Sequence, residues 1–187
     1  MLVDVTLQIT PKMVTDAQGN EKKALAGHLG THFDVMDKEF PLEYTRREGI
    51  LFDVSKVDGR DICSDDIDLD KVQRDMFVAF YSGYIEKAGY GSKLYFTEHP
   101  QLSNELIEKL LDKQISIIGL DFAGIRRGRE HTVTDQTCAD RNVFIVENLC
   151  NLKKLISSDR MTIHTYPMSY RGVTGLPCRV IAELEED

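Results

Sequence analysis

The sequence has no tryptophan, no long apolar run and no Cys-x-x-Cys pair. A helix that crosses a bilayer needs about 20 consecutive apolar residues, so we expect no association with a membrane. The wide spacing of the cysteines excludes a zinc knuckle, and we interpret them as free thiols in a reducing cytoplasm rather than as a disulfide framework. The four cysteines are Cys63, Cys138, Cys150 and Cys178.

The chain also has fewer basic than acidic residues. The chain has 23 Lys and Arg residues against 31 Asp and Glu residues, a net charge of −8. Because an acidic protein is repelled by phosphates, nucleic acid is not expected as a partner. The local basic cluster at 125–129 is interpreted as a solvated loop. The segment 1–5 carries an acidic side chain where a signal peptide carries basic ones, which favours a cytoplasmic location.

Length and composition are typical of one globular domain over residues 1–187. With 42% hydrophobic and 29% charged residues, the chain can bury a substantial core. Ser103 is a good N-cap for a helix whose apolar stripe begins at Leu106, and 148–156 is predicted as a second, short helix. Apolar and alternating runs predict strands at 2–9, 50–54, 76–81, 114–118, 143–146, 161–166 and 179–184. A strand-rich order with about three helices indicates an α/β or α+β fold.

One short segment concentrates metal-binding side chains. The sequence Gly-His-Leu-Gly-Thr-His-Phe-Asp at 27–34 contains His28, His32 and Asp34, and two of the five histidines of the chain fall in it. Neutral imidazoles together with one anionic oxygen are the ligands that a borderline divalent ion such as Zn²⁺ prefers. The segment is therefore our first candidate for a metal site.

This segment must bend if its side chains are to share one ion. On a flat strand His28 and Asp34 would lie about 20 Å apart, several times the span of a metal site. The glycines make a helix unfavourable, and Gly30 permits a bend because it has no Cβ. We predict a strand that ends in a curved loop with Gly30 as the pivot. The alternative is a half-buried strand with solvated polar residues.

The pattern His-x-Gly-Thr-His-x-Asp resembles the signature of the cyclase family of metal-dependent hydrolases, which includes bacterial kynurenine formamidases and isatin hydrolases. Further segments resemble blocks of that family in the same order, and they cover most of the chain. They are 98–103, 117–121, 143–152 and 175–182. The resemblance implies the family's single-domain, swivelling β/β/α arrangement with a mixed sheet. It also implies a divalent metal, a small-molecule substrate and a homodimer or homotetramer.

The resemblance also implies a set of metal ligands. His28, His32 and Asp34 match the three ligands of the signature, and Asp34 matches the carboxylate that bridges two ions in binuclear members. Glu147 matches a ligand glutamate further along the chain, and its place after the apolar run 143–146 predicts a position at the end of a strand.

One implied ligand is replaced. The family has a ligand histidine twelve residues before the glutamate, where this chain has Asp135. A carboxylate can still bind the ion and favours Mn²⁺ or Mg²⁺ over Zn²⁺, so we expect either Zn²⁺ or Mn²⁺ as the cofactor. The alternatives are that Asp135 is a polar loop residue, or that His131, four residues upstream, takes the place of the missing ligand.

The catalytic part of the pattern differs more. After the second histidine the family reads Asp-x-Pro-x-His, whereas Met36 and Lys38 stand at the proline and histidine positions here. Lys38 could exchange protons only if its pKa were lowered by burial or by nearby cations, and the alternative is a solvated surface charge. Residues 10–27 contain no aromatic, so the family's aromatic substrate contact has no counterpart.

These observations predict a metal-dependent, arylformamidase-like hydrolase that opens an amide, formamide or cyclic amide bond with a metal-activated water. Lys38 and Glu147 are the candidate catalytic residues. The metal candidates are His28, His32, Asp34, Asp135 and Glu147. The alternative is a degenerate family member that binds metal or a small ligand without turnover.

Overall fold

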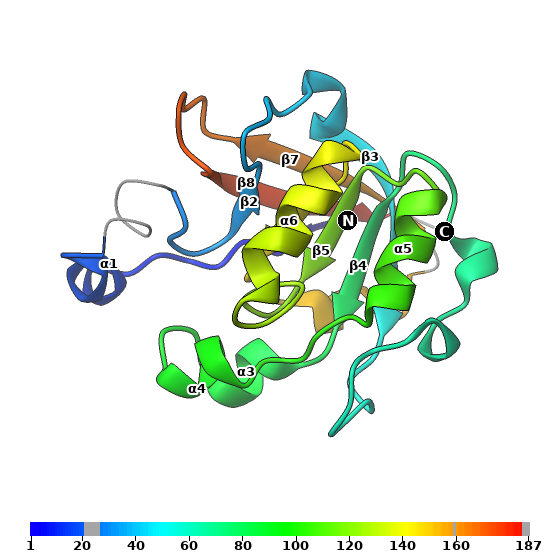
Figure 1. The fold of residues 1–187 in the computed structure, drawn as a ribbon, viewed down its shortest axis with the longest axis horizontal. Helices are drawn as coiled ribbons and strands as arrows, with labels where there is room; N and C mark the ends of the chain where they lie inside the picture. Colours follow the sequence, from blue (N-terminus) through cyan, green and yellow to red (C-terminus); the bar gives the residue numbers. More distant parts are fainter. Residues whose placement is uncertain (21–26, 159, 185–187) are drawn as a thin grey trace.

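The strands of this protein form a single sheet that closes into a barrel (Figure 1). The computed structural model describes residues 1–20, 27–158 and 160–184. Around the barrel the order is β8-β2-β6-β5-β4-β3-β7, and β7 pairs back onto β8, while β1 extends the sheet beyond β8. The strands are β1 (Leu2–Asp4), β2 (His32–Asp34), β3 (Arg46–Asp53), β4 (Phe77–Tyr81), β5 (Ile117–Leu120), β6 (Phe144–Glu147), β7 (Met161–Pro167) and β8 (Gly175–Leu184).

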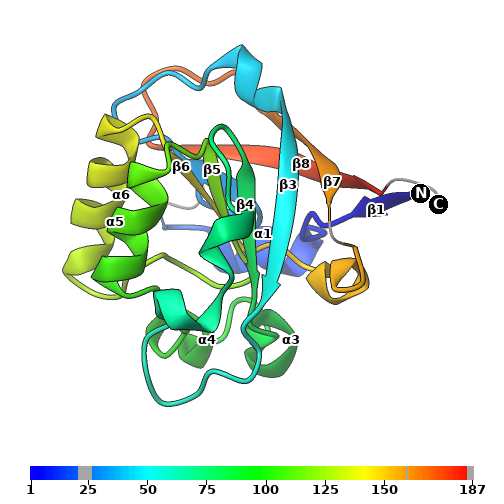
Figure 2. The same cartoon turned by 90° about the vertical axis from the view of Figure 1, so that its right-hand side faces the viewer.

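The helices lie outside the barrel. Within the described residues they are α1 (Pro11–Ala17), α3 (Tyr84–Ala88), α4 (Lys93–Thr97), α5 (Asn104–Asp112) and α6 (Glu130–Asp140), with short 3-10 turns at Leu42–Thr45, Ser64–Asp66, Leu69–Lys71 and Leu152–Leu155. Figure 2 shows α5 and α6 side by side against the strands β4, β5 and β6. None of the helices described is long and apolar enough to cross a membrane.

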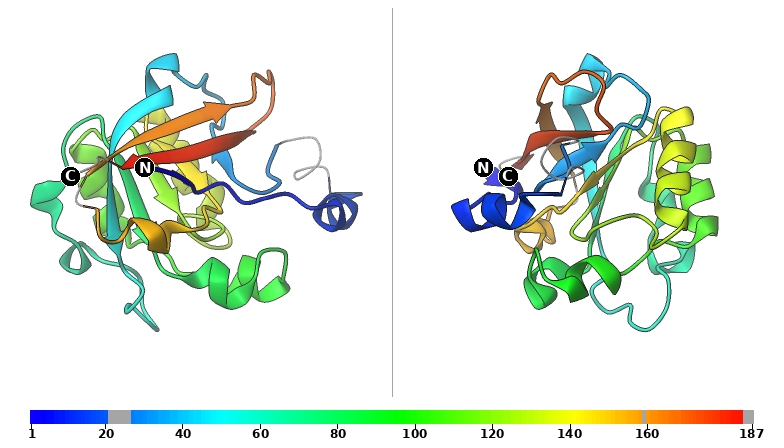
Figure 3. Two further views of the ribbon diagram at one scale, coloured as in Figure 1. Left: turned by 180° about the vertical axis from the view of Figure 1, so that it is seen from behind. Right: turned by 60° about the vertical axis from the view of Figure 1, so that its left-hand side comes forward.

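Two kinds of strand pairing make up the sheet. Strands β3, β4, β5 and β6 are parallel, and the crossovers that join β4 to β5 and β5 to β6 carry α5 and α6. The rest is antiparallel: β7 and β8 form the long ribbon seen from behind in Figure 3, and β2 is paired with both β6 and β8. The carboxyl end of β6 and the short strand β2 therefore lie next to each other.

Apolar side chains fill both faces of the strands. One cluster fills the barrel and includes Phe33, Phe77 and Phe144, all buried. A second cluster lies between the parallel strands and the helices, where Phe80 packs near the apolar stripe of α5. The predicted N-cap is confirmed, since the Ser103 hydroxyl accepts a hydrogen bond from the Leu106 amide at 3.1 Å.

The predicted α/β class and mixed sheet are confirmed, but some details are wrong. The described residues contain five α-helices instead of about three. The prediction missed α1, α3 and α4, because helices this short show no clear apolar stripe in the sequence. The predicted strand 2–9 ends at Asp4, and the segment 148–156 forms only the 3-10 turn. The swivelling arrangement and the family's oligomeric state stay predictions.

The interpretation of the basic cluster at 125–129 as a solvated loop is partly wrong. Arg126 is buried, and its guanidinium pairs with Asp61 and Glu130, each at 2.6 Å. It also donates to the Leu102 carbonyl at 2.7 Å. This buried cation therefore holds the start of α6 against the loop before α5.

A buried histidine makes the stability of this fold depend on pH. The His99 side chain stacks on Phe122 and donates from Nδ1 to the Pro100 carbonyl at 2.7 Å. Burial lowers the pKa of His99 from 6.5 to about 4. Between these two pH values the unfolded chain binds a proton that the folded chain excludes, so stability falls as the pH falls.

We expect His99→Asn to remove this contribution, since Asn keeps a donor near the Nδ1 position and does not titrate. Between pH 7.5 and pH 4.5 the wild type should lose about 2–3 kcal/mol more unfolding free energy than the variant. Urea denaturation of both proteins at the two pH values measures this difference. Equal losses in both proteins would show that His99 does not cause the acid sensitivity.

Candidate metal centre

The candidate site is built where β2 lies against the end of β6. The two strands are antiparallel, with His32 opposite Glu147 and Asp34 opposite Ile145. Because side chains alternate along a strand, His32 and Asp34 share one face while Phe33 points into the barrel core. Glu147 is the last residue of β6, as predicted, and His32, Asp34 and Glu147 are all buried.

His28 reaches the same place because the chain turns sharply before β2. Gly27 and Gly30 adopt φ values of +80° and +73°, which residues with a Cβ rarely adopt. His28 Nδ1 consequently lies 3.0 Å from His32 Nε2 and 3.1 Å from Asp34 Oδ1. The predicted bend at Gly30 is confirmed, but its predicted place at the end of a strand is wrong, because the loop precedes β2.

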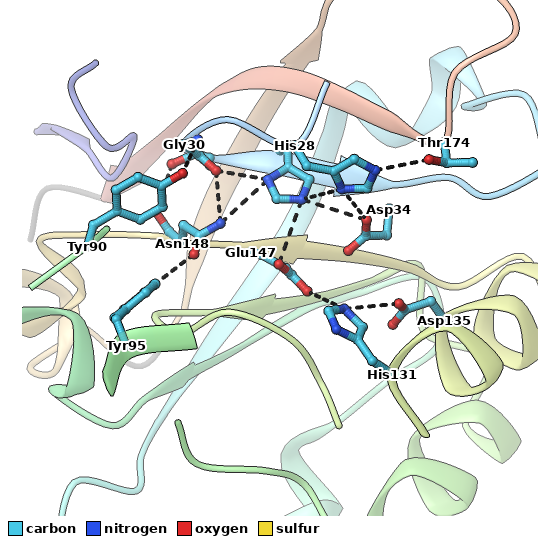
Figure 4. A network of polar contacts seen from close by, with 12 residues as sticks. His28, Gly30, Asp34, Tyr90, Tyr95, His131, Asp135, Glu147, Asn148 and Thr174 are labelled. Atoms are coloured by element: carbon cyan, nitrogen blue, oxygen red, sulfur yellow. Dashed lines mark hydrogen bonds and ion pairs between the residues drawn. The ribbon is translucent and has the colours of Figure 1, made fainter. Parts of the chain in front are cut away.

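Helix α6 contributes two further side chains, one turn apart. His131 Nε2 lies 3.1 Å from Glu147 Oε1 and 3.2 Å from Asp135 Oδ2 (Figure 4). The alternative that Asp135 is a loop residue is wrong, because Asp135 lies within α6 and is buried. The sequence left Asp135 and His131 as rivals for one position, whereas the structure brings both to the cluster.

The donor set fits a divalent cation. His32 Nδ1 donates to the Gly30 carbonyl at 2.8 Å, so in the neutral ring Nε2 presents its lone pair toward Asp34. Asp34 Oδ2 and Asp135 Oδ1 are buried without a hydrogen-bond partner among the described residues. Buried carboxylate oxygens are costly unless paired or bound to metal, so these two oxygens indicate that a cation belongs here.

Two overlapping groups of side chains have their ligand atoms within 4.8 Å of one another. One group is His28, His32 and Asp34, and the other is Asp34, His131 and Asp135. Asp34 is common to both, so its carboxylate lies where it could contact two ions.

The charges of the cluster are strongly coupled. Burial disfavours ionisation of Asp34, but the His32 and His28 imidazoles outweigh it and hold the pKa of Asp34 well below its usual range. Burial and the charge of Asp34 raise the pKa of both Asp135 and Glu147 well above the ordinary value. Burial lowers the pKa of His32, but the Asp34 and Glu147 carboxylates overcome this and raise that pKa to about 9. Without a cation the cluster therefore holds protons that a bound ion would displace.

A second layer of polar groups fixes the loop that carries His32. Asn148 donates from Nδ2 to the Gly30 carbonyl at 2.9 Å, and its Oδ1 accepts from the Tyr95 hydroxyl at 2.8 Å. The Gly30 amide donates to the Tyr90 hydroxyl at 2.8 Å (Figure 4). Asn148 follows Glu147 directly. One short backbone segment therefore carries both a carboxylate of the cluster and the amide that holds the Gly30 carbonyl, to which His32 is bonded. Tyr90 and Tyr95 could not be predicted as part of the site, because no local sequence pattern connects them to the motif.

Lys38 lies apart from this cluster. Its ammonium pairs with Asp140 at 2.7 Å and with Asp37 at 3.2 Å, and it does not line the cavity that contains the histidines. Hydrogen bonds to these two carboxylates raise the pKa of Lys38, the opposite of what proton exchange at neutral pH requires. This placement favours the alternative interpretation of Lys38 as a surface charge.

The site opens into a cavity of about 450 Å³. Its lining combines the polar cluster with the apolar side chains of Met36, Phe96 and Ala123. A small-molecule pocket is typically of this size, apolar over much of its wall and equipped with a few convergent polar groups. The fold and the site thus define an α/β barrel protein with a histidine and carboxylate centre suited to a divalent ion.

The Cyclase family model, described as "Putative cyclase", matches residues 3–126, about two thirds of the chain. This protein therefore belongs to the Cyclase family, and the resemblance drawn from the motifs is confirmed. A search of curated proteins finds no match.

Solved structures of similar fold cover nearly the whole chain. A potential metal-dependent hydrolase with cyclase activity is 26% identical with a TM-score of 0.77, covering 100% of this chain and 99% of that one. A predicted metal-dependent hydrolase from Bacillus stearothermophilus is 24% identical with a TM-score of 0.73, covering 97% of each chain. Isatin hydrolase A from Labrenzia aggregata is 17% identical with a TM-score of 0.76, covering 100% of this chain and 94% of that one. The last two show the shared fold.

The glycine turn before β2 can be tested by adding single methyl groups. A Cβ at Gly27 would lie 2.0 Å from the Gly175 carbonyl oxygen, which is backbone, whereas a Cβ at Gly30 would meet the movable end of the Ile9 side chain at 2.3 Å. We expect Gly27→Ala to lower the Tm and metal affinity clearly more than Gly30→Ala, because both residues have positive φ but only Gly27 meets backbone. Thermal melts and metal titrations compare them, and equal effects would contradict this account of the loop.

The support of His32 gives a second prediction. Tyr95→Phe removes only the hydroxyl that fixes the Asn148 amide, and Asn148→Leu removes the bond to Gly30 as well. We expect metal affinity to fall about 10-fold in the first variant and up to about 100-fold in the second, as for other outer-shell partners of metal-bound histidines. Tyr84→Phe is the matched control, because the Tyr84 hydroxyl donates to the Leu94 carbonyl on α4 and to no group of the metal cluster among the described residues. Unchanged affinity in Asn148→Leu would exclude a positioning role.

Proposed function

We propose that this protein is a metal-dependent hydrolase of amide, formamide or cyclic amide bonds, arylformamidase-like in its reaction. The observation that carries the proposal is that His28 and His32 converge on Oδ1 of the buried Asp34, while Asp34 Oδ2 and Asp135 Oδ1 have no hydrogen-bond partner in the described structure. Such a set has little structural use without a cation, and it faces a cavity of substrate size.

The similar structures support this reaction class. The nearest in sequence of those described above is a potential metal-dependent hydrolase, and the isatin hydrolases share the fold over almost their whole length. Isatin is a cyclic amide, so a hydrolase of that compound opens a bond of the class proposed here. An open-chain formamide presents the same carbonyl chemistry.

The residues divide into two neighbouring positions for metal. His28, His32 and Asp34 would hold the first ion, a nitrogen-rich set that suits Zn²⁺. Asp34, His131 and Asp135 would hold a second ion, a set with more carboxylate oxygen that suits Mn²⁺. When bound, such an ion supplies polarisation of the substrate carbonyl and a lowered pKa for a coordinated water.

Glu147 is our candidate for moving a proton. Its Oε2 lies 3.7 Å from His32 Nε2, and its Oε1 lies 3.1 Å from His131 Nε2. It therefore stands between the two groups, where it can serve as a ligand or take up the proton of the attacking water and share it with His131. Lys38 does not suit this role, because its ammonium pairs with Asp140 away from the cluster.

A non-catalytic metal or ligand binder is the second candidate. The observation that favours it is the position of Lys38, since the residue at the family's catalytic histidine position does not reach the cavity. We also propose that the protein acts on a small-molecule substrate and forms a homodimer or homotetramer. The support for both is the resemblance to the family.

The test is metal content measured together with hydrolysis. After loading with Zn²⁺ or Mn²⁺ and gel filtration, we expect the wild type to retain metal and His32→Ala to bind at least about 100-fold more weakly. His164→Ala is the matched control, because His164 pairs with Glu183 on the far ribbon and belongs to neither ligand group. Mass spectrometry gives the metal content, and N-formylkynurenine and isatin are the first substrates.

Three outcomes are decisive. Metal retained by the wild type and lost in His32→Ala, with turnover, supports the hydrolase. Metal without turnover of any amide or formamide favours the non-catalytic binder. A wild type that retains no metal, or a His32→Ala variant that retains as much as the wild type, overturns the site itself.

A further inference from the structure

A larger groove adjoins the cavity of the metal centre. This groove, of about 810 Å³, lies between the segments 35–42 and 167–174, the second of which spans the turn between β7 and β8. We call it the hairpin groove. Met36 and Thr174 line both the groove and the metal cavity, so the two spaces share a wall.

The hairpin groove exposes large apolar side chains. Leu42 is 79% exposed, and Met168 and Tyr170 are each 52% exposed. Phe40 and Val173, which also line the groove, pack against the barrel core, and the charged residues Asp37, Lys38, Glu39 and Arg171 complete the lining. Apolar surface concentrated beside a polar reaction site is typical of a place that binds the apolar part of a ligand.

The shared wall is tied directly to a candidate ligand. The Thr174 hydroxyl lies 3.0 Å from His28 Nε2, on the side of the ring away from Asp34. The Thr174 carbonyl accepts hydrogen bonds from the amides of Val35 and Met36, at 2.9 and 3.3 Å. Thr174 therefore joins the residues on this shared wall, through its side chain to His28 and through its carbonyl to Val35 and Met36.

Met36, which lies on the shared wall, adopts an unfavourable backbone conformation. Its φ is +55°, in the left-handed region that side chains other than glycine, asparagine and aspartate rarely occupy. Backbone strain of this kind persists where surrounding contacts impose it, and it clusters at binding sites. The result is a flexible, apolar side chain placed on the wall that the metal cavity shares with the hairpin groove.

We propose that the substrates are amides that carry an extended apolar chain or ring, and that this apolar part crosses Met36 into the hairpin groove. The inference rests on the proposed function, because the reacting amide must lie at the metal centre. The inference specifies the class of substrate, which the cavity at the metal centre does not define by itself. Met36 would act as a specificity-determining residue at the entrance to the groove.

The test separates the metal-binding end of a ligand from its apolar end. Hydroxamates bind divalent metals through one small head group, so acetohydroxamate, hexanohydroxamate and octanohydroxamate differ only in chain length. Each fully buried methylene strengthens binding about fourfold. We therefore expect octanohydroxamate to bind the Zn²⁺-loaded protein at least roughly 100-fold more tightly than acetohydroxamate, measured by isothermal titration calorimetry.

Substitutions locate the source of this gain. M168D and L42D place a charge in the hairpin groove at exposed positions, and we expect each to reduce the ratio of octanohydroxamate to acetohydroxamate affinity at least tenfold. L94D is the matched control, because Leu94 is 55% exposed on α4 and lines neither space. In L94D the ratio should equal that of the wild type. M36F should also reduce the ratio by narrowing the proposed entrance to the groove.

The outcomes distinguish this inference from the proposed function. If acetohydroxamate fails to bind the metal-loaded protein, the metal centre itself is wrong. If it binds but chain length brings no gain, or if L94D reduces the ratio as much as M168D, the groove is not the site of the apolar part. If sedimentation shows a dimer that M168D dissociates, with no gain from chain length, a second copy of the chain covers the groove and the inference is overturned.

Discussion

The arrangement of this molecule around its site depends on the neutralisation of buried negative charge. Asp34, Asp135 and Glu147 are all buried within one small cluster, and among the described residues the groups that pair with them there are imidazoles. Burial is costly for each ionised carboxylate, and their mutual repulsion adds to this cost. Protons can relieve it, as the raised pKa values of Asp135 and Glu147 indicate, but protons leave two carboxylate oxygens without partners. A divalent ion would satisfy both needs together.

The barrel brings these groups together from distant parts of the sequence. A short antiparallel strand, β2, is inserted beside the parallel strand β6, so the face of β2 that carries His32 and Asp34 meets the carboxyl end of β6 at Glu147. Helix α6 follows β5 and returns across the same face with His131 and Asp135. Ligands in α/β proteins commonly bind where the carboxyl ends of parallel strands meet a change in strand order, and this site follows that rule.

Features of the site that lie within one short segment were predictable from the sequence. Contacts between segments far apart in the sequence were not. The spacing of His28, His32 and Asp34 required a bend, and only Gly30 in their midst could supply it. The loop was predicted to follow a strand, but it precedes β2. Alternation of side chains does not show at which end of the segment the strand ends and the loop begins. The roles of Asp135 and His131 stayed open, since both lie on the same face of a helix that has no apolar stripe to reveal it.

The fold shows the same division. The buried strands and the Ser103 helix follow from apolar runs and a capping residue, and these were predicted close to their observed positions. Closure of the barrel through β7 and β8, and the insertion of β2 between β6 and β8, depend on pairings between distant segments that no single stretch of sequence encodes. Tyr95 and Thr174 support the site through side-chain hydrogen bonds to distant segments and could be recognised only in three dimensions.

The most direct test of the central claim is anomalous diffraction from crystals of the protein loaded with Zn²⁺ or Mn²⁺, with data collected on both sides of the metal absorption edge. We expect an anomalous peak within bonding distance of His28 Nδ1, His32 Nε2 and a carboxylate oxygen of Asp34. Any second peak should lie beside His131 and Asp135. A loaded crystal with no peak at this cluster, or with its metal elsewhere, would contradict the central claim.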